Sequence, residues 1–399
     1  MSKQPISRGV YLSPAEVFGD GVCLKRLRDE GVQEVVLRTG FDPSKCDPHT
    51  AAAADAVRDA GMRLCLLVGG WWGEGIDPGP AAMQPLPGDW PIVTPEQAHE
   101  SAWPMHCPCG PWSQVIAATV EELARSIVPD AICLTHARFH HAADLPSLFS
   151  RGSSAYESAA IELGLTPDAL LVALRTVARR LADSGRQTIR ASASPQGLGD
   201  WLDRWGQTDL FSRWFAFRSS VIAEAVGRVR NALPSDLPET PKFGVNMLNP
   251  FWCELSGQSL PLVSRGMDFI QPLLGYVHWH LVQPLEQWAR WLTRMQPALS
   301  TSDATWIIAH IIGAEALADA TPDHWSSPDV SPLPLLGGLM NACRRVLLRA
   351  GVARHRLQIV LRGNDWPAEW LRDQAQQWQN AGVGAIVYQG HASLTGSSA

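Results

Sequence analysis

Short apolar runs alternate with helix-like segments along almost the whole of this 399-residue chain. The run Arg63–Val68 is continuous and apolar after its first residue, as a strand buried on both faces requires. Strands that alternate with helices predict a parallel sheet, and eight of them predict an α/β fold of the (β/α)₈ TIM-barrel type. The predicted strands are residues 9–12, 34–38, 63–68, 131–135, 242–246, 267–272, 357–362 and 385–388.

Residues 140–241 interrupt this alternation, because no further strand-like run is found before Lys242. We therefore expect a helical insertion after the fourth strand, within a single domain that covers residues 1–391. The tail 392–399, rich in Ser, is expected to be disordered. Helices are predicted at residues 22–30, 49–60, 112–126, 156–163, 167–183, 210–233 and 367–380.

Residues 304–313 fit two structures. Their apolar run could form a ninth strand, or a helix that is capped by Ser302 or Asp303 and continues to Ala318. Periodicity does not distinguish the two in a short apolar run. Because eight strands already complete the barrel, we favour the helix.

Composition excludes several classes of partner. The net charge is -6 and the pI is near 6.1, so no basic surface for nucleic acid is expected. No apolar segment approaches the ~20 residues of a membrane span, and the N-terminus carries no signal-like segment. Two of the eight cysteines, Cys65 and Cys133, lie in apolar strand-like runs, where a reduced Cys packs as a small hydrophobe. These features predict a reduced cytoplasmic protein; the oligomeric state is not specified.

Polar and aromatic residues are concentrated where the predicted strands end. In barrels of this type the active site lies at the carboxyl-terminal ends of the strands. Tryptophan faces in loops can stack on sugar rings, although loop packing explains each of them equally well. We therefore expect a carbohydrate site there, without a cofactor because no Gly-rich phosphate loop is present. The candidate substrate-binding residues are Tyr11, Arg38, Trp71, Trp72, Thr135, His136, Arg138, His140, Asn246, Trp252, Gln271, Tyr276, Arg362 and Tyr388.

Histidines and cysteines offer two further readings. His136, His140 and His141 follow the fourth strand, and His278 and His280 follow the sixth, but their spacing matches no zinc pattern and no metal site is predicted. The Cys107-Pro-Cys109 sequence is not a Cys-x-x-Cys motif, which favours a structural role over a redox or metal one.

Four passages of the sequence together form a recognisable pattern. They are Gly9-Val-Tyr-Leu-Ser13, Cys107-Pro-x-x-Pro-Trp112, Asp130-Ala-Ile-Cys-Leu-Thr-His-Ala-Arg-Phe139 and Met267-Asp-Phe-Ile-Gln-Pro-Leu-Leu-Gly-Tyr276. They resemble bacterial glycoside-hydrolase-like (β/α)₈ barrels, a mostly uncharacterised group distantly similar to retaining glycosidases. The resemblance covers nearly the whole barrel, and its motifs are specific mainly in their order and spacing.

The resemblance implies a carbohydrate-active enzyme, and one residue departs from it. The carboxylate that the family carries at the end of its fourth strand is replaced here by Thr135. Glycosidases normally use two carboxylates, so the catalytic candidates become Glu254 with Asp365 or Glu74, and His136 is an alternative general base. Three hypotheses stay open: a glycoside hydrolase, an inactive barrel that binds a saccharide or a protein partner, and a lyase or metal-assisted hydrolase that uses histidines.

Overall fold

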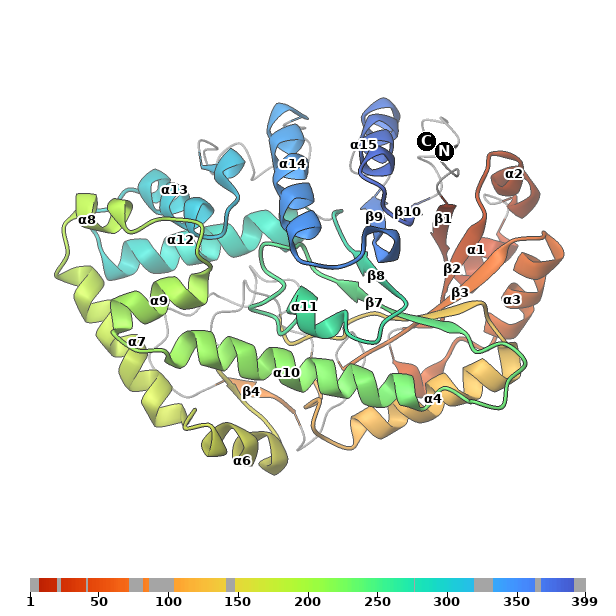
Figure 1. Cartoon of the computed structure of the whole chain (residues 1–399), viewed down its shortest axis with the longest axis horizontal. Helices are drawn as coiled ribbons and strands as arrows, with labels where there is room; N and C mark the ends of the chain where they lie inside the picture. Colours follow the sequence, from red (N-terminus) through yellow and green to blue (C-terminus); the bar gives the residue numbers. More distant parts are fainter. Residues whose placement is uncertain are drawn as a thin grey trace.

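Eight parallel strands form a closed barrel at the centre of the molecule, which confirms the predicted fold (Figure 1). Two isolated parallel bridges, Ile270 to Leu357 and Leu273 to Val360, join the strands at the two ends of the sheet and close it. The computed structural model describes residues 7–19, 23–40, 42–71, 82–85, 104–140, 148–275, 277–318, 333–362 and 367–390.

The sheet order β8-β7-β5-β3-β2-β1-β10-β9 follows the chain around the barrel. All eight predicted strands are confirmed to within three residues at each end. The barrel strands are β1 (Ser7–Leu12), β2 (Glu34–Arg38), β3 (Arg63–Val68), β5 (Ala131–Leu134), β7 (Lys242–Met247), β8 (Phe269–Pro272), β9 (Gln358–Arg362) and β10 (Ala385–Gln389). A separate antiparallel pair consists of β4 (Gln84–Pro85) and β6 (Ser150–Arg151).

Alternate residues of the strands point into the barrel and form a small core of their own, separate from the core under the helices. Gly244 on β7 leaves the space that the Phe269 ring of β8 occupies. A Cβ atom at Gly244 would lie 2.3 Å from that ring. The core inside the barrel consists of Tyr11, Val36, Cys65, Leu67, Ala131, Cys133, Phe269, Val360 and Val387.

Helices surround the barrel, and the predicted insertion follows β5 (Figure 1). Its last and longest helix, α10, lies beside α4 on the outside of the barrel. The helices of the insertion are α6 (Ser154–Glu162), α7 (Pro167–Ala182), α8 (Arg186–Ala191), α9 (Leu198–Gly206) and α10 (Leu210–Asn231). The other α-helices are α1 (Pro14–Phe18), α2 (Leu24–Asp29), α3 (Thr50–Asp59), α4 (Trp112–Ile127), α11 (Leu260–Val263), α12 (Gln283–Met295), α13 (Thr301–Ile311), α14 (Leu333–Arg349) and α15 (Ala368–Asn380).

The ambiguous segment 304–313 is helical, as favoured, but its cap differs from the prediction. Ser300 is the N-cap of α13, and Asp303 completes a capping box three residues later. The helix ends at Ile311 rather than at Ala318, because Gly313 adopts φ +77° and a separate 3₁₀ turn follows.

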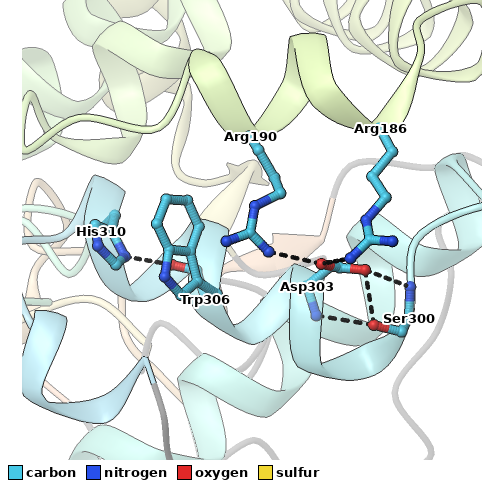
Figure 2. A network of polar contacts seen from close by, with 6 residues as sticks. All are labelled: Arg186, Arg190, Ser300, Asp303, Trp306 and His310. Carbon is cyan, nitrogen blue, oxygen red and sulfur yellow. Dashed lines mark hydrogen bonds and ion pairs between the residues drawn. The ribbon is translucent and has the colours of Figure 1, made fainter.

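Asp303 also joins α13 to the insertion (Figure 2). Its side chain is 4% exposed and accepts hydrogen bonds from Arg186 and Arg190 of α8, each at 2.8 Å. The Arg190 guanidinium lies 4.1 Å from the Trp306 ring centre. Burial alone raises the pKa of Asp303, but the hydrogen bonds from Ser300, Arg190 and Arg186 outweigh it and lower the pKa to about 2.

Two expectations stay predictions. The tail 392–399 lies beyond the described residues, and the division of the chain into one domain stays a prediction. Among the helices of the described residues, none meets the length and hydropathy that a membrane span requires.

Candidate functional site

Three predicted ligand-binding residues meet inside the barrel. Tyr11 donates from its hydroxyl to Gln271 Oε1 at 2.7 Å. Asn246 donates from Nδ2 to the same oxygen at 2.8 Å and to the Tyr11 hydroxyl at 2.9 Å. Gln271 Nε2 donates in turn to Gln358 Oε1 at 2.8 Å. Because these buried groups hydrogen-bond one another, they form a rigid polar layer below the strand ends.

Thr135 lies beside Asn246, which is itself part of this layer. The β5–β7 register pairs Leu134 with Val245, so Thr135 and Asn246 are the next residues along the two neighbouring strands. Both are buried. Among the described residues, none hydrogen-bonds the Thr135 hydroxyl or the Asn246 Oδ1 atom. The hydroxyl and the amide oxygen are therefore placed to bind a ligand group.

The backbone segments that follow β3 and β5 lie very close together beside Thr135. A Cβ atom at Gly70 would lie 2.5 Å from the Thr135 carbonyl oxygen, so only glycine fits there. Trp71 N donates to the His136 carbonyl at 3.3 Å, and His136 itself adopts φ +52°. Left-handed backbone is uncommon for a residue other than glycine and is found preferentially at functional sites.

A carboxylate that the sequence analysis missed lies at the edge of the same mouth. Glu16 of α1 lies 2.6 Å from the guanidinium of Arg38, the last residue of β2. It also accepts hydrogen bonds from the backbone N and the hydroxyl of Ser13. Burial raises the pKa of Glu16, but the hydrogen bonds from Ser13 and Arg38 outweigh burial and lower the pKa below its usual value. The carboxylate is therefore anionic at neutral pH. The Ser13-x-x-Glu16 capping-box pattern after the first strand was the available signal.

The two described tryptophans proposed for stacking are packed inside the protein. Trp71 and Trp252 are both 0% exposed, and Trp71 donates from its indole nitrogen to Ser113 at 2.8 Å. In this structure neither ring presents a face to solvent. Their role in stacking on sugar stays a prediction. Trp72 lies outside the described residues.

Arg138, His140 and Tyr388 are also buried. Arg138 lies just beyond β5 and donates to the Phe139 carbonyl at 3.4 Å. Burial raises the pKa of Tyr388 above its usual value. Arg362 ends β9 and is half-buried. Within the described residues, no group of three His, Cys, Asp or Glu side chains could hold a metal; His141 and the His278 side chain lie outside them.

Glu254 faces a pocket to which neither Thr135 nor Asn246 contributes. It lines a pocket of about 350 Å³ between the loop after β7 and helices α9 and α10, together with Asp200. Burial raises the pKa of Glu254, and the charge of Asp200 raises it further. No pattern in the sequence connects Asp200 with Glu254. The other catalytic candidates, Asp365 and Glu74, lie outside the described residues, as does Tyr276, so the predicted pairings stay predictions.

Two aspartates of the resembling motifs lie at the opposite end of the barrel. Asp130 accepts a hydrogen bond from the Leu64 backbone at 2.7 Å, and Asp268 accepts one from the Phe243 backbone at 2.8 Å. Each satisfies a backbone donor at the start of a neighbouring strand. Asp268 and Asp130 therefore have the same structural role, away from the mouth.

Comparisons with known proteins gave structural likenesses only. No family model matches the chain, and no curated protein matches it. A GH18 chitinase from Pseudoalteromonas aurantia is similar with 10% identity and a TM-score of 0.39, over 96% of this chain and 94% of that one. A chitinase from Rhizomucor miehei is similar with 8% identity and a TM-score of 0.43, over 97% of this chain and 95% of that one. A chitinase-like agglutinin from Robinia pseudoacacia is similar with 9% identity and a TM-score of 0.40, over 97% of this chain and 96% of that one. The barrel assignment rests on the strand order above.

Proposed function

We propose that the carboxyl-terminal mouth of this barrel binds a saccharide. The observation that carries the proposal is the adjacent pair of Thr135 and Asn246, whose hydroxyl and Oδ1 atoms have no hydrogen-bond partner among the described residues. A hydroxyl and an amide oxygen together suit the hydroxyl groups of a sugar, which both donate and accept. The resemblance of the four motifs to glycoside-hydrolase-like barrels supports the same class of ligand.

The surroundings of this pair favour binding of a neutral ligand. Asn246 uses both of its amide hydrogens on Tyr11 and Gln271, which fixes the direction of its oxygen. Arg38 at the rim is paired with the Glu16 carboxylate, so its charge is largely compensated. A fixed acceptor beside a rotatable hydroxyl costs little conformational entropy on binding.

Thr135→Val tests this proposal, because it removes the hydroxyl and keeps the shape of the side chain. Calorimetry against a panel of oligosaccharides first identifies a ligand of the unmodified chain. We expect the substitution to weaken binding of that ligand about tenfold, the value of one hydrogen bond of about 1.4 kcal/mol. Thr176→Val on the exposed face of α7 is the matched control and should leave the affinity unchanged. Equal affinity of the Thr135 variant and the unmodified chain would refute the proposal.

Glycoside hydrolysis is the second candidate function. In the sequence, Asp365 comes three residues after Arg362, the last residue of β9, and Glu74 comes six residues after Val68, the last residue of β3. Two carboxylates about 5–9.5 Å apart are required for this reaction. Asp365→Asn and Glu74→Gln should each abolish turnover of a bound glycoside while binding persists. Unchanged turnover in both variants would exclude this pair and leave Glu254 to be tested in the same way.

A further inference from the structure

A pocket of about 350 Å³ lies between helices α9 and α10 of the insertion and the chain that follows β7. Helices α9, α10 and α11 lie together on one side of the barrel (Figure 1). The pocket is open to solvent, and its volume is within the range of about 300–1,000 Å³ that is typical of small-molecule sites. A small molecule with an apolar body fits it, because the walls are largely apolar. They include Phe215, Phe251, Leu255, Leu262, Ile312 and Val346.

The charge of this pocket is negative. Among its described lining residues, Asp200 and Glu254 are the only charged ones. Neither carboxylate forms an ion pair or a side-chain hydrogen bond within the part of the chain that the structure describes. Arg204 of α9 donates to the amide oxygen of Gln196, which also lines the pocket, and to neither carboxylate. Both acidic residues are exposed, so a cation that enters the pocket can reach them.

Helix geometry explains one of these two acidic residues but not the other. Asp200 lies in the first turn of α9, where the helix dipole favours a negative charge. Glu254 is in the loop after β7, whose backbone is held by hydrogen bonds from Gly257 N to the Glu254 carbonyl at 3.0 Å and from Gln258 N to the Cys253 carbonyl at 2.7 Å. Although solvent reaches Glu254, the protein around it excludes enough water to raise its pKa, and the charge of Asp200 raises that pKa further. A bound cation would relieve this unfavourable charge.

A buried hydroxyl group is also directed toward the pocket. Ser212, Phe215, Ala216 and Ser219 all line the pocket, and their spacing of three and four residues places them on one face of α10. Ser219 is 2% exposed. Among the described residues, none hydrogen-bonds its hydroxyl, whereas the hydroxyl of the neighbouring Ser220 donates to the Ala216 carbonyl at 3.1 Å. Because buried hydroxyl groups are normally hydrogen-bonded, the Ser219 oxygen is available to accept a hydrogen bond from a ligand.

We propose that this pocket binds a small organic ammonium ion. The ammonium group lies against the carboxylates of Asp200 and Glu254 and donates to the Ser219 hydroxyl, and the apolar part of the ligand packs against the walls. These walls favour an organic cation over Mg²⁺ or Ca²⁺, which need about six or more oxygen ligands. Phe215 and Phe251 add aromatic rings, to which organic cations are attracted. A neutral ligand would cover the two negative charges without compensating them.

Calorimetry on the full chain tests the proposal with matched probes. Phenethylamine carries an ammonium group on a short apolar body. Phenethyl alcohol has the same ring and chain length with a neutral hydroxyl group, and ethylamine has the charge without the ring. We expect phenethylamine to bind about tenfold more tightly than either of these, because it alone uses both the carboxylates and the apolar walls. Equal binding of phenethyl alcohol, equal binding of ethylamine, or no binding of phenethylamine would each overturn the proposal.

Substitution of Glu254 assigns the binding to this pocket. Glu254→Gln removes one carboxylate and keeps the shape of the side chain, so it should weaken phenethylamine binding about tenfold, the value of one hydrogen bond to a charged group. Glu224→Gln is the matched control and should leave the affinity unchanged, since Glu224 is exposed on α10 and does not line the pocket. If the two variants bind phenethylamine equally well, the ligand does not occupy this site and the proposal is wrong.

A second substitution tests the pocket without altering its charge. Ala216 is exposed and lines the pocket, so Ala216→Leu should fill part of the space and leave both carboxylates in place. We expect it to weaken phenethylamine binding by a similar factor, and an unchanged affinity would contradict the proposed position of the ligand. The comparison of the three probes uses the unmodified chain, so it stands even if a variant fails to fold.

Discussion

Replacement of Asp303 by Asn should weaken the junction between the helical insertion and α13. The substitution keeps the shape of the side chain and removes the charge that Arg186 and Arg190 share. The pKa of Asp303 is lowered from 3.8 to about 2, which corresponds to about 2 kcal/mol of stability at neutral pH. Because the two arginines are 57% and 36% exposed, solvent screening makes this figure an upper value.

The pH dependence has a definite sign. A carboxyl group whose pKa is lowered by folding stabilises the protein above its unfolded pKa, and the stabilisation is lost as pH falls through the folded pKa. The difference in unfolding free energy between the unmodified chain and Asp303→Asn should be full at pH 7, about half by pH 3, and absent below about pH 2.

Urea denaturation followed by tryptophan fluorescence between pH 7 and pH 3 measures this difference. Asp168→Asn is the matched control, since Asp168 lies in the first turn of α7, is exposed and makes no ion pair among the described residues. We expect the control to cost less than about 0.5 kcal/mol at every pH. A difference for Asp303 that is as small as the control, or that does not change with pH, would refute the reasoning.

Two further substitutions test the mouth. Gly70→Ala should destabilise the chain by about 2–3 kcal/mol in urea denaturation, because its Cβ atom would clash with the Thr135 carbonyl. Gly227→Ala is the control and should be neutral or stabilising, because no atom lies within 4 Å of the added Cβ. An equal effect of the two substitutions would contradict the close approach at Gly70. Glu16→Gln should lower the free energy of unfolding by less than about 1 kcal/mol at pH 7, because the ion pair with Arg38 is partly exposed. This cost should shrink as pH falls below 4.5, since the pKa of Glu16 is lowered in the folded protein. A cost that grows in acid would contradict the lowered pKa.

The strands were predictable because a barrel strand is buried on both faces. Val10 and Leu66 face the helices, and Val36 and Cys133 face the inside of the barrel. None of the four has exposed surface, so apolar residues occupy both faces of the strands. The first residue of α13 was less predictable, since Ser300, Ser302 and Asp303 are all good N-capping residues. Only the backbone conformation shows that Ser300 is the N-cap.

The site was predictable only where strand alternation still applied. Tyr11, Asn246 and Gln271 lie within strands, so their inward direction follows from the period of two. Glu254 lies in a loop seven residues after β7, where that period no longer fixes direction, and it faces the insertion instead. Loop tryptophans such as Trp252 give no local signal of burial, because the elements that cover them are distant in the sequence.

The closing junction between β8 and β9 differs from every other junction of the barrel. Other neighbouring barrel strands share continuous ladders of backbone pairs, but here only two isolated bridges are formed. The amide of Gln271 binds Gln358 across this gap, so a side-chain contact supplements the missing backbone ladder. This junction has fewer backbone pairs than any other junction of the barrel. A circularly permuted chain with its ends between β8 and β9 would keep all seven continuous ladders.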